Sequence, residues 1–389
     1  MSLQSFPLPA VVGGYRPIHS TSFREELIGE NAFYNQPDYF ESTQRDLTAN
    51  KSLPVAYTWN TEYKIVRIVK QILTIIIFPI GIYKLLHILA GKLALLPASS
   101  PTFLIGYPEN HANDSRSSIP LEGDWKYKRI TVEVDGYKVD AMIVGKASTL
   151  NNGRWVLSSN GNGEFYEDEL SYSRDFKQIL IEIKGNAIVF NYPGVGASSG
   201  LPNRQAMAKA YRAMLSFLED QNNGIGAREI VGYGNSIGGG VQGDALKTHA
   251  LKRDVKYVFV KSRTFSDLST TASILTCRPL GFLVKLLGWN MDSTVSSKKL
   301  QAPEIIMQTA RVQKYEELHE SSKIIGDGVI PANASLAKAL LDDATCPKRN
   351  KLFIGMSERH NDELGNPSFL AQRIETFLRL YPLHDLDDK

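Results

Sequence analysis

Short apolar segments alternate with longer amphipathic ones from about residue 120 to the end of the chain. The apolar segments are WVLSS (155–159), NAIVFNYPG (186–194), REIVGYG (228–234), VKYVFV (255–260), PEIIMQT (303–309) and KLFIGM (351–356). Short runs rich in β-branched residues are typical of strands covered on both faces. Between several of them lie helical patterns, and residues 203–220 place Met207, Tyr211, Met214 and Leu218 on one helical face. This alternation predicts an α/β fold, a mostly parallel sheet with helices on both faces.

Two further signals refine this pattern. RITVEVDGYKVDAMIVG (129–145) predicts two antiparallel strands before the parallel sheet, joined by Asp135 and Gly136 in a two-residue turn. Near the end of the chain, Asn366 and Pro367 suit the cap and first turn of a helix over FLAQRIETFLRL. A helical insertion is expected after the PEIIMQT strand.

The segment 65–98 has a different pattern. Its core from Ile72 to Tyr83 is uncharged, but it is shorter than the roughly 20 apolar residues that a spanning helix needs, and Pro79 and Gly81 would kink a helix there. The flanking basic residues are Arg67, Lys70, Lys84 and Lys92. We expect an interfacial helix or helical hairpin that dips into a membrane. The alternative is a buried helical pair that covers the sheet.

These patterns divide the chain into three regions: an irregular region 1–64, the apolar helical segment 65–98 and a catalytic domain 120–389. Composition fits a globular protein, with 43% hydrophobic and 22% charged residues among 389. The net charge of +3, with no basic run interleaved with aromatics, gives no reason to expect a nucleic-acid partner. Two cysteines, Cys277 and Cys346, cannot form a disulfide framework. No Cys/His cluster has zinc-ligand spacing, so no metal is expected.

The stretch GYGNSIGGG places Ser236 between an expected strand and an expected helix. Gly234 and Gly238 complete a G-x-S-x-G motif, whose serine occupies a sharp strand-to-helix turn in hydrolases that use a serine nucleophile. Such a turn leaves no room for side chains two residues on either side of the serine, which explains both glycines. Ser236 is therefore the expected nucleophile.

A serine hydroxyl needs a base to remove its proton, and the base needs an acid to orient it. His360 follows the late strand KLFIGM, where the order Ser…Asp/Glu…His requires the base. Asp327 lies among glycines after the preceding strand and is the expected acid, with Asp292 as the alternative. The backbone amide of Ile237 should help to bind the oxyanion, together with that of Asn162 or, alternatively, Gly163.

Taken together, residues 125–380 resemble the α/β-hydrolase superfamily. SNGNG resembles the HGNG-like oxyanion loop, with Asn160 where histidine is usual. NYPGVGASSG resembles the DYRGYGxSxG segment, with Asn191 where aspartate is common. The remaining motifs follow in the order of that superfamily: the elbow GNSIGG, the acid loop DGVIP and His360 before Asn361. The apolar block FPIGIYKLLHILAGK resembles a narrower group, the chlamydial 43 kDa protein homologues and the related SidB-type secreted effectors of intracellular bacteria.

This resemblance implies a lipase or esterase without a cofactor. We expect a serine hydrolase that cleaves a lipid or acyl ester. A thioesterase or acyl-peptide hydrolase would use the same residues, and a non-catalytic, membrane-docked interaction protein with this fold is the remaining alternative. The first twenty residues lack a cleaved secretory signal pattern. We expect the protein at a membrane surface, or in a host cell into which it is secreted without a Sec-type signal. If it is secreted, a host target is expected as its partner. The cytoplasm is the remaining alternative.

Overall fold

The computed structural model describes residues 15–17, 47, 51–59, 64–76, 78–92, 97–99, 107–108, 110–121 and 123–380. Its strands form one sheet of eleven, in the order β1-β2-β3-β4-β6-β5-β7-β8-β9-β11-β10. The strands are β1 Tyr15–Pro17, β2 Lys51–Tyr57, β3 Trp125–Val134, β4 Tyr137–Lys146, β5 Arg154–Ser159, β6 Asn186–Phe190, β7 Glu229–Asn235, β8 Lys256–Ser262, β9 Glu304–Thr309, β10 Glu316–Glu317 and β11 Lys351–Met356.

Strands β5 to β9 and β11 are paired in parallel, and β3 and β4 form the expected antiparallel hairpin beside them. Asp135 and Gly136 both have positive φ, 48° and 87°, as a tight two-residue turn requires. All six apolar segments singled out in the sequence lie in the parallel part of the sheet. In the second of them only Asn186–Phe190 is strand, and the following NYPG is a loop.

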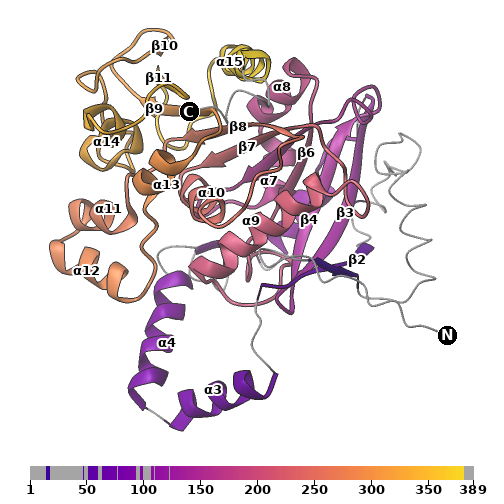
Figure 1. Cartoon of the computed structure of the whole chain (residues 1–389), viewed down its shortest axis with the longest axis vertical. Coiled ribbons are helices and arrows are strands. Elements are labelled where there is room, and N and C mark those ends of the chain that lie inside the picture. The colour runs from indigo at the N-terminus through magenta and orange to yellow at the C-terminus, as the bar shows by residue number, and fades with distance from the viewer. Residues whose placement is uncertain are drawn as a thin grey trace.

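Helices cover both faces of the sheet (Figure 1). The helices are α3 Lys64–Ile76, α4 Phe78–Ala90, α6 His111–Ser117, α7 Tyr166–Tyr172, α8 Arg174–Glu182, α9 Arg204–Glu219, α10 Ile237–Leu246, α11 Leu268–Leu275, α12 Arg278–Leu286, α13 Ser293–Lys299, α14 Leu336–Asp342 and α15 Pro367–Leu380, with the short 3₁₀ turns η3 Pro97–Ser99 and η4 Ala332–Ala334.

Alternation along the strands assigns their side chains to two hydrophobic clusters. On β5, Trp155 and Leu157 pack in the cluster that contains α9 and α10, whereas Val156 packs in the cluster of α8 and α15. Each parallel strand is thus buried on both faces, as its apolar sequence predicts. The arrangement is the α/β-hydrolase fold.

Helix boundaries follow the expected signals. α9 begins after Asn203, whose side chain accepts hydrogen bonds from the amides of Gln205 and Ala206. Its expected inner face is fully buried. α15 begins at Pro367, and the side chain of Asn366 accepts a hydrogen bond from the amide of Phe369. These caps satisfy amides that have no partner within a helix.

Two expectations about secondary structure are wrong. Residues 51–57 lie within the supposedly irregular region 1–64, yet they form β2 and pair in parallel with β3. A register shift between Ser52 and Ala56, around Pro54, interrupts the alternation that would identify a strand. The expected helix after β9 is absent: residues 310–331 form turns and the short edge strand β10.

The body of the fold that follows also begins before residue 120. α6 packs against α7, with His111 Nε2 2.9 Å from Asp168 and the Arg116 guanidinium paired with Glu167. Arg116 and Glu167 are both fully buried. A buried charge is tolerated when it is paired, so this contact fixes α6 to the body.

Residues 65–98 are helical where the structure describes them, and most of the large apolar side chains described on α3 and α4 are exposed. α3 ends at Ile76 and α4 begins at Phe78, so Pro79 lies in the first turn of a new helix, where proline is tolerated. The pair projects from the rest of the molecule (Figure 1). The alternative of a buried pair covering the sheet is therefore wrong. Ile77 and residues 93–96 lie outside the described residues. Among the helices that the structure describes, none has the length and apolarity to cross a membrane.

Candidate active site

Ser236 stands at the turn between β7 and α10. Its backbone has φ 53° and ψ −120°, a strained conformation that non-glycine residues rarely adopt. Hydrogen bonds hold it there: the Ser236 amide donates to the carbonyl of Ser262, and the Ser236 carbonyl accepts from the Gly239 amide and the Thr264 hydroxyl. This is the elbow that the sequence motif predicts.

Both elbow glycines are required by their neighbours. A Cβ at Gly238 would lie 2.0 Å from the carbonyl oxygen of Ser159, and one at Gly234 would lie 2.8 Å from the backbone of Gly239. Neither neighbour is a flexible side-chain end, so any larger residue would displace the backbone.

Ser236, His360 and Asp327 form one hydrogen-bonded chain. His360 Nε2 lies 2.9 Å from Ser236 Oγ, and His360 Nδ1 lies 2.8 Å from Asp327 Oδ2. An ionised carboxylate can only accept hydrogen bonds, so Nδ1 carries the proton and Nε2 accepts from the serine hydroxyl. This is the protonation state in which an imidazole can act as a base toward serine.

The environment of Asp327 keeps its carboxylate ionised. Burial raises its pKa, but hydrogen bonds from His360 and from the amides of Ile330 and Val329 outweigh burial and leave the pKa below its usual value. The side chain is only 1% exposed. The His360 amide also donates to the Asp327 carbonyl, so the two loops are joined through backbone as well as side chains.

Asp292, the alternative acid, has a different role. Its carboxylate caps α13 by accepting a hydrogen bond from the amide of Val295, 2.8 Å away. Its β-region backbone and capping geometry match a helix N-cap, and no interaction joins it to His360 within the described residues.

The expected oxyanion donors lie at the same edge of the sheet. Ile237 is the first residue of α10, where helical amides have no partner within the helix. Asn162 and Gly163 lie in the loop after β5, which packs directly on α10 through Ser159 and Asn160. In that loop the Gly161 amide donates to Glu164, and the Gly163 carbonyl accepts from the Tyr107 hydroxyl. The amides of Asn162 and Gly163 make no hydrogen bond within the described part of the chain.

The two asparagines that depart from the usual pattern do not touch the triad. The carbonyl of Asn160 accepts from the Tyr192 hydroxyl, and its buried side-chain nitrogen has no hydrogen-bond partner in the described part of the chain. The Asn191 side chain donates to Glu167 and accepts from the amide of Tyr166. Asn191 therefore ties the loop after β6 to the start of α7.

Arg263 is a site residue that the sequence did not reveal. It is buried, adopts φ 48° after β8, and its guanidinium donates to the carbonyls of Arg359 and Asp362, on both sides of His360. The Thr309 hydroxyl donates to the carbonyl of Glu358 in the same loop. These contacts fix the loop that carries the imidazole. Backbone carbonyl partners leave no pattern in sequence, so no motif could have identified Arg263.

Comparison with known proteins identifies a family that covers most of the chain. Residues 34–378 match the family model described as Chlamydia CHLPS protein (DUF818). The chain belongs to this family. A curated relative, the alpha/beta hydrolase domain-containing protein WAV2 of Arabidopsis thaliana, is 28% identical over 107 residues. That match covers 27% of this chain and 33% of the relative, so the chain spans about a third of that protein.

Similar solved structures include an esterase of Pyrococcus furiosus, with 15% sequence identity and a TM-score of 0.46 over 66% of this chain and 91% of that one. Another is an alpha-beta hydrolase from Vibrio vulnificus, with 15% identity and a TM-score of 0.47 over 64% of this chain and 79% of that one. Family membership confirms the resemblance to the chlamydial proteins, and the fold confirms the resemblance to the α/β hydrolases.

Proposed function

We propose that this protein is a serine hydrolase that cleaves carboxylic esters with Ser236, His360 and Asp327. The observation that carries the proposal is the continuous hydrogen-bonded chain from Asp327 through His360 to a serine on a strained elbow. Strain at a single non-glycine residue is retained where function requires it. A non-catalytic interaction protein would have no need for that geometry.

The proposed reaction has two halves. As Ser236 Oγ attacks the ester carbonyl, His360 Nε2 takes its proton, and the ionised Asp327 stabilises the imidazolium that forms. The oxyanion would accept hydrogen bonds from the amides of Ile237 and Asn162, with Gly163 as the alternative second donor. Collapse breaks the ester C–O bond, and His360 gives its proton to the departing alcohol. Water, activated by the same imidazole, then releases the acid and regenerates Ser236.

Hydrolysis of neutral p-nitrophenyl esters by the full-length protein tests this proposal. We expect turnover by the wild type, and a kcat/KM lower by roughly a thousandfold or more in Ser236→Ala, because removal of a triad member leaves only residual catalysis. Matched thioester and anilide substrates test the thioesterase and acyl-peptide hydrolase alternatives. Folded wild type that cleaves none of them, or a Ser236→Ala protein as active as wild type, would contradict the proposal.

We further propose that the protein works at a membrane surface. Four helices carry large apolar side chains that are exposed by about two fifths or more, and we call this set the apolar surface: Ile65, Val66, Ile68, Val69, Ile72 and Leu73 on α3, Ile80, Ile82, Tyr83, Leu85, Leu86 and Leu89 on α4, Ile274 and Leu275 on α11, and Leu280, Phe282, Leu283 and Leu286 on α12. Apolar patches of this kind mark interaction sites.

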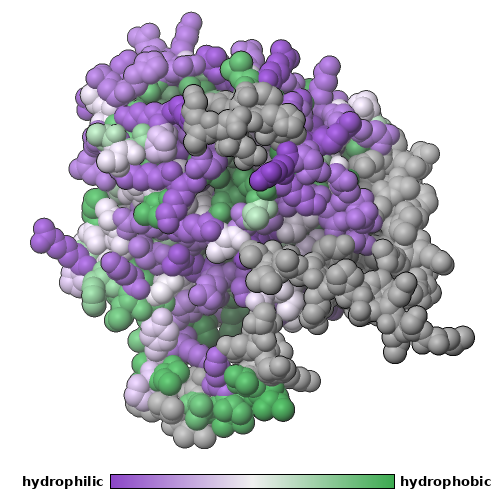
Figure 2. All heavy atoms as spheres, in the orientation of Figure 1, coloured by the Kyte–Doolittle hydropathy of each residue, from purple (hydrophilic) through white to green (hydrophobic). Residues whose placement is uncertain are grey.

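The part of this surface on α11 and α12 was not expected from the sequence. α4 is fixed beside the end of α12, because His87 Nδ1 lies 2.7 Å from the carbonyl of Leu287, and the Trp289 indole donates to the carbonyl of His87. The His87 and Trp289 rings stack at 4.9 Å. In Figure 2 hydrophobic residues gather over α3 and α4 and again beside α11 and α12.

Charge supports a lipid partner. α3, α4, α11 and α12 contain no aspartate or glutamate, and they carry Lys64, Arg67, Lys70, Lys84, Arg278 and Lys285. Apolar side chains flanked by basic ones suit the interface of a membrane that contains anionic lipid. Each of α3 and α4 has 13 residues, about 20 Å of helix, which suits a helix lying along the surface.

A further inference from the structure

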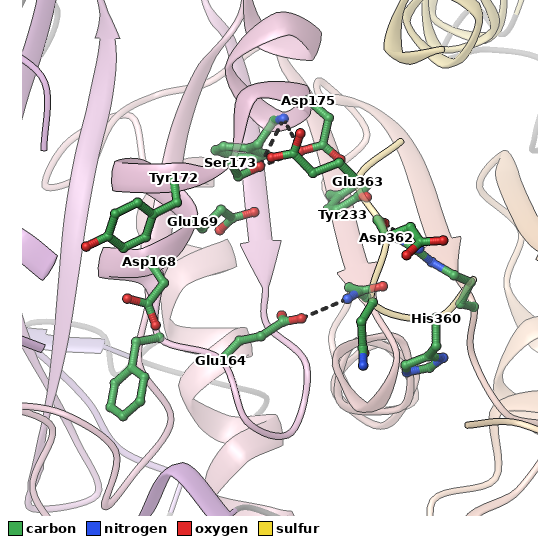
Figure 3. Close-up of a pocket in the computed structure, with 15 residues that line it drawn as sticks. Glu164, Asp168, Glu169, Tyr172, Ser173, Asp175, Tyr233, His360, Asp362 and Glu363 are labelled. Atoms are coloured by element: carbon green, nitrogen blue, oxygen red, sulfur yellow. Dashed lines mark hydrogen bonds between the residues drawn. The ribbon is translucent and has the colours of Figure 1, made fainter. Parts of the chain in front are cut away.

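A pocket of about 270 Å³ opens beside the triad. Its walls come from α7 and the loop before it, the start of α8, the end of β7 and the loop that carries His360. Figure 3 shows carboxylates on both sides of this hollow and His360 at one end. The acidic residues that line it are Glu164, Asp168, Glu169, Asp175, Asp362 and Glu363.

The negative charge of this pocket is poorly neutralised by the protein. Asp168 accepts from His111 and Ser115, but within the described residues none of the other five carboxylates forms an ion pair with lysine or arginine. Their partners are hydroxyls, amides and an asparagine side chain. The lining guanidinium of Arg263 is directed at backbone carbonyls. An uncompensated negative pocket attracts a cation.

Aromatic side chains make up much of the remaining wall: Phe165, Tyr172, Phe176 and Tyr233. Tyr233 lies at the end of β7, three residues before Ser236, and is only 8% exposed. Its hydroxyl has no hydrogen-bond partner among the described residues, although it lines the pocket with the carboxylates (Figure 3). With no partner among these residues, this hydroxyl can donate a hydrogen bond to a ligand in the pocket.

The chemistry of the lining separates two kinds of cation. A metal ion needs several ligands that converge on one point, and the described residues contain no group of three or more His, Cys, Asp or Glu side chains that could hold one. Carboxylates spread over a wall with aromatic rings suit a larger cation of diffuse charge, because ring faces attract alkylammonium groups.

We propose that this pocket binds an organic ammonium group, so that the ester cleaved by Ser236 carries a positive charge close to its carbonyl. The inference rests on the proposed ester hydrolysis. Asn235, adjacent to Ser236, and His360 both line the pocket, so a substrate in it reaches the nucleophile. Glu164 accepts from both the Asn235 side chain, at 3.1 Å, and the Gly161 amide, and so joins the pocket to the oxyanion loop.

Glu169 adds a pH dependence to this binding. Burial is the largest effect on the pKa of Glu169, and together with the negative charges of Glu164 and Asp175 it raises that pKa to about 8. The hydrogen bond that the Ser158 hydroxyl donates to Glu169 lowers the pKa and offsets part of this rise. The other titratable groups facing the pocket are Asp168, Tyr172, Tyr233, Arg263, His360, Asp362 and Glu363. A bound cation favours ionised Glu169, so cation affinity should rise as pH increases through about 8, and binding below that pH should release a proton.

The kinetic test compares an acyl choline ester with its uncharged isostere, the neohexyl ester, in the full-length protein. We expect kcat/KM to favour the choline ester by at least about tenfold. In the double variant Glu169→Gln/Glu363→Gln the preference should largely disappear while hydrolysis of the neohexyl ester persists. Glu182→Gln, on the exposed end of α8 outside the pocket, is the control and should keep the preference.

Binding to the inactive Ser236→Ala protein separates this inference from the proposed function. Saturation-transfer NMR with choline and with neohexyl alcohol should detect choline alone, with tighter binding at about pH 9 than at about pH 6.5, and Glu169→Gln should remove that pH difference. Absence of ester hydrolysis would contradict the proposed function and leave this test intact. Equal binding of choline and the alcohol, or choline binding unaffected by Glu169→Gln/Glu363→Gln, would overturn the cation site.

Discussion

Asp327, the expected acid, and Asp292, its alternative, have different surroundings in the structure. Asp327 is buried and accepts from His360 and two backbone amides, whereas Asp292 caps α13. We predict that Asp327→Asn lowers ester kcat/KM by roughly a thousandfold or more, because an amide favours the wrong imidazole tautomer. Asp292→Asn should leave kcat/KM unchanged and shift the free energy of unfolding by less than about 0.5 kcal/mol, since asparagine caps equally well.

Double variants sharpen this comparison. If His360 acts through Ser236, His360→Ala should cost nearly as much activity as Ser236→Ala, and the double variant little more. Steady-state kinetics and urea unfolding on each protein provide the measurements. A damaging Asp292→Asn together with a silent Asp327→Asn would show that the acid has been assigned wrongly.

At this scale the sequence reveals some site residues and hides others. Ser236, Asp327 and His360 occur in the order that the motifs require, and glycines flank Ser236 and Asp327. Arg263 contacts backbone carbonyls and Tyr233 lines a pocket, and neither arrangement leaves a local pattern in the sequence. The acidic run EFYEDE at 164–169 is visible in the sequence, but only the fold brings it to the same pocket as Asp362 and Glu363.

Among the elements, α3, α4, α11 and α12 carry the proposed membrane contact. We predict that Leu85→Asp/Leu86→Asp, and separately Phe282→Asp/Leu286→Asp, weaken flotation of the protein with vesicles of phosphatidylcholine and phosphatidylserine. These side chains are 45–68% exposed, so the melting temperature without lipid should change little. The matched control is Ile181→Asp on α8, with 43% exposure outside the apolar surface.

The same variants can contradict the membrane proposal. Flotation that persists in both pairs would remove the apolar surface from lipid binding. A large drop in melting temperature without lipid would indicate instead that these side chains stabilise the fold. Neutral vesicles should float less protein than anionic ones, because the basic residues beside the surface would lose their partners.

Elements with a clear hydrophobic period were predictable, and those without one were not. The parallel strands, the β3–β4 hairpin, α9 and α15 have strong patterns and caps. β2 was missed because Pro54 lies at a register shift. A helix was expected between PEIIMQT and IIGDGVIP, where charged residues recur without an apolar face to check the assignment, and the structure has turns and a short strand there. α11 and α12 were overlooked as part of the apolar surface, since their placement beside α4 depends on tertiary contacts of His87 and Trp289.

In the molecule as a whole, the sheet brings distant positions together. Ser236 and His360 are 124 residues apart in the chain, and His360 and Asp327 are 33 apart, yet each pair is within hydrogen-bond distance. Ser236 and His360 follow β7 and β11, whose carboxyl ends lie at one edge of the parallel sheet, and the segment after β9 and β10 brings Asp327 to the same edge. Open α/β sheets place their binding sites at this edge. The order of the motifs in the sequence thus predicted that Ser236, Asp327 and His360 act together, and the topology of the sheet explains why these side chains meet.

The most direct test of the central claim is covalent labelling of the full-length protein by a fluorophosphonate, followed by mass spectrometry of its peptides. An activated serine reacts with such a probe whatever the natural substrate is. We predict a single adduct on Ser236, strongly reduced in His360→Ala and absent from folded Ser236→Ala protein. An unlabelled wild type, or an adduct that persists on another residue in Ser236→Ala, would contradict the assignment of Ser236 as the nucleophile.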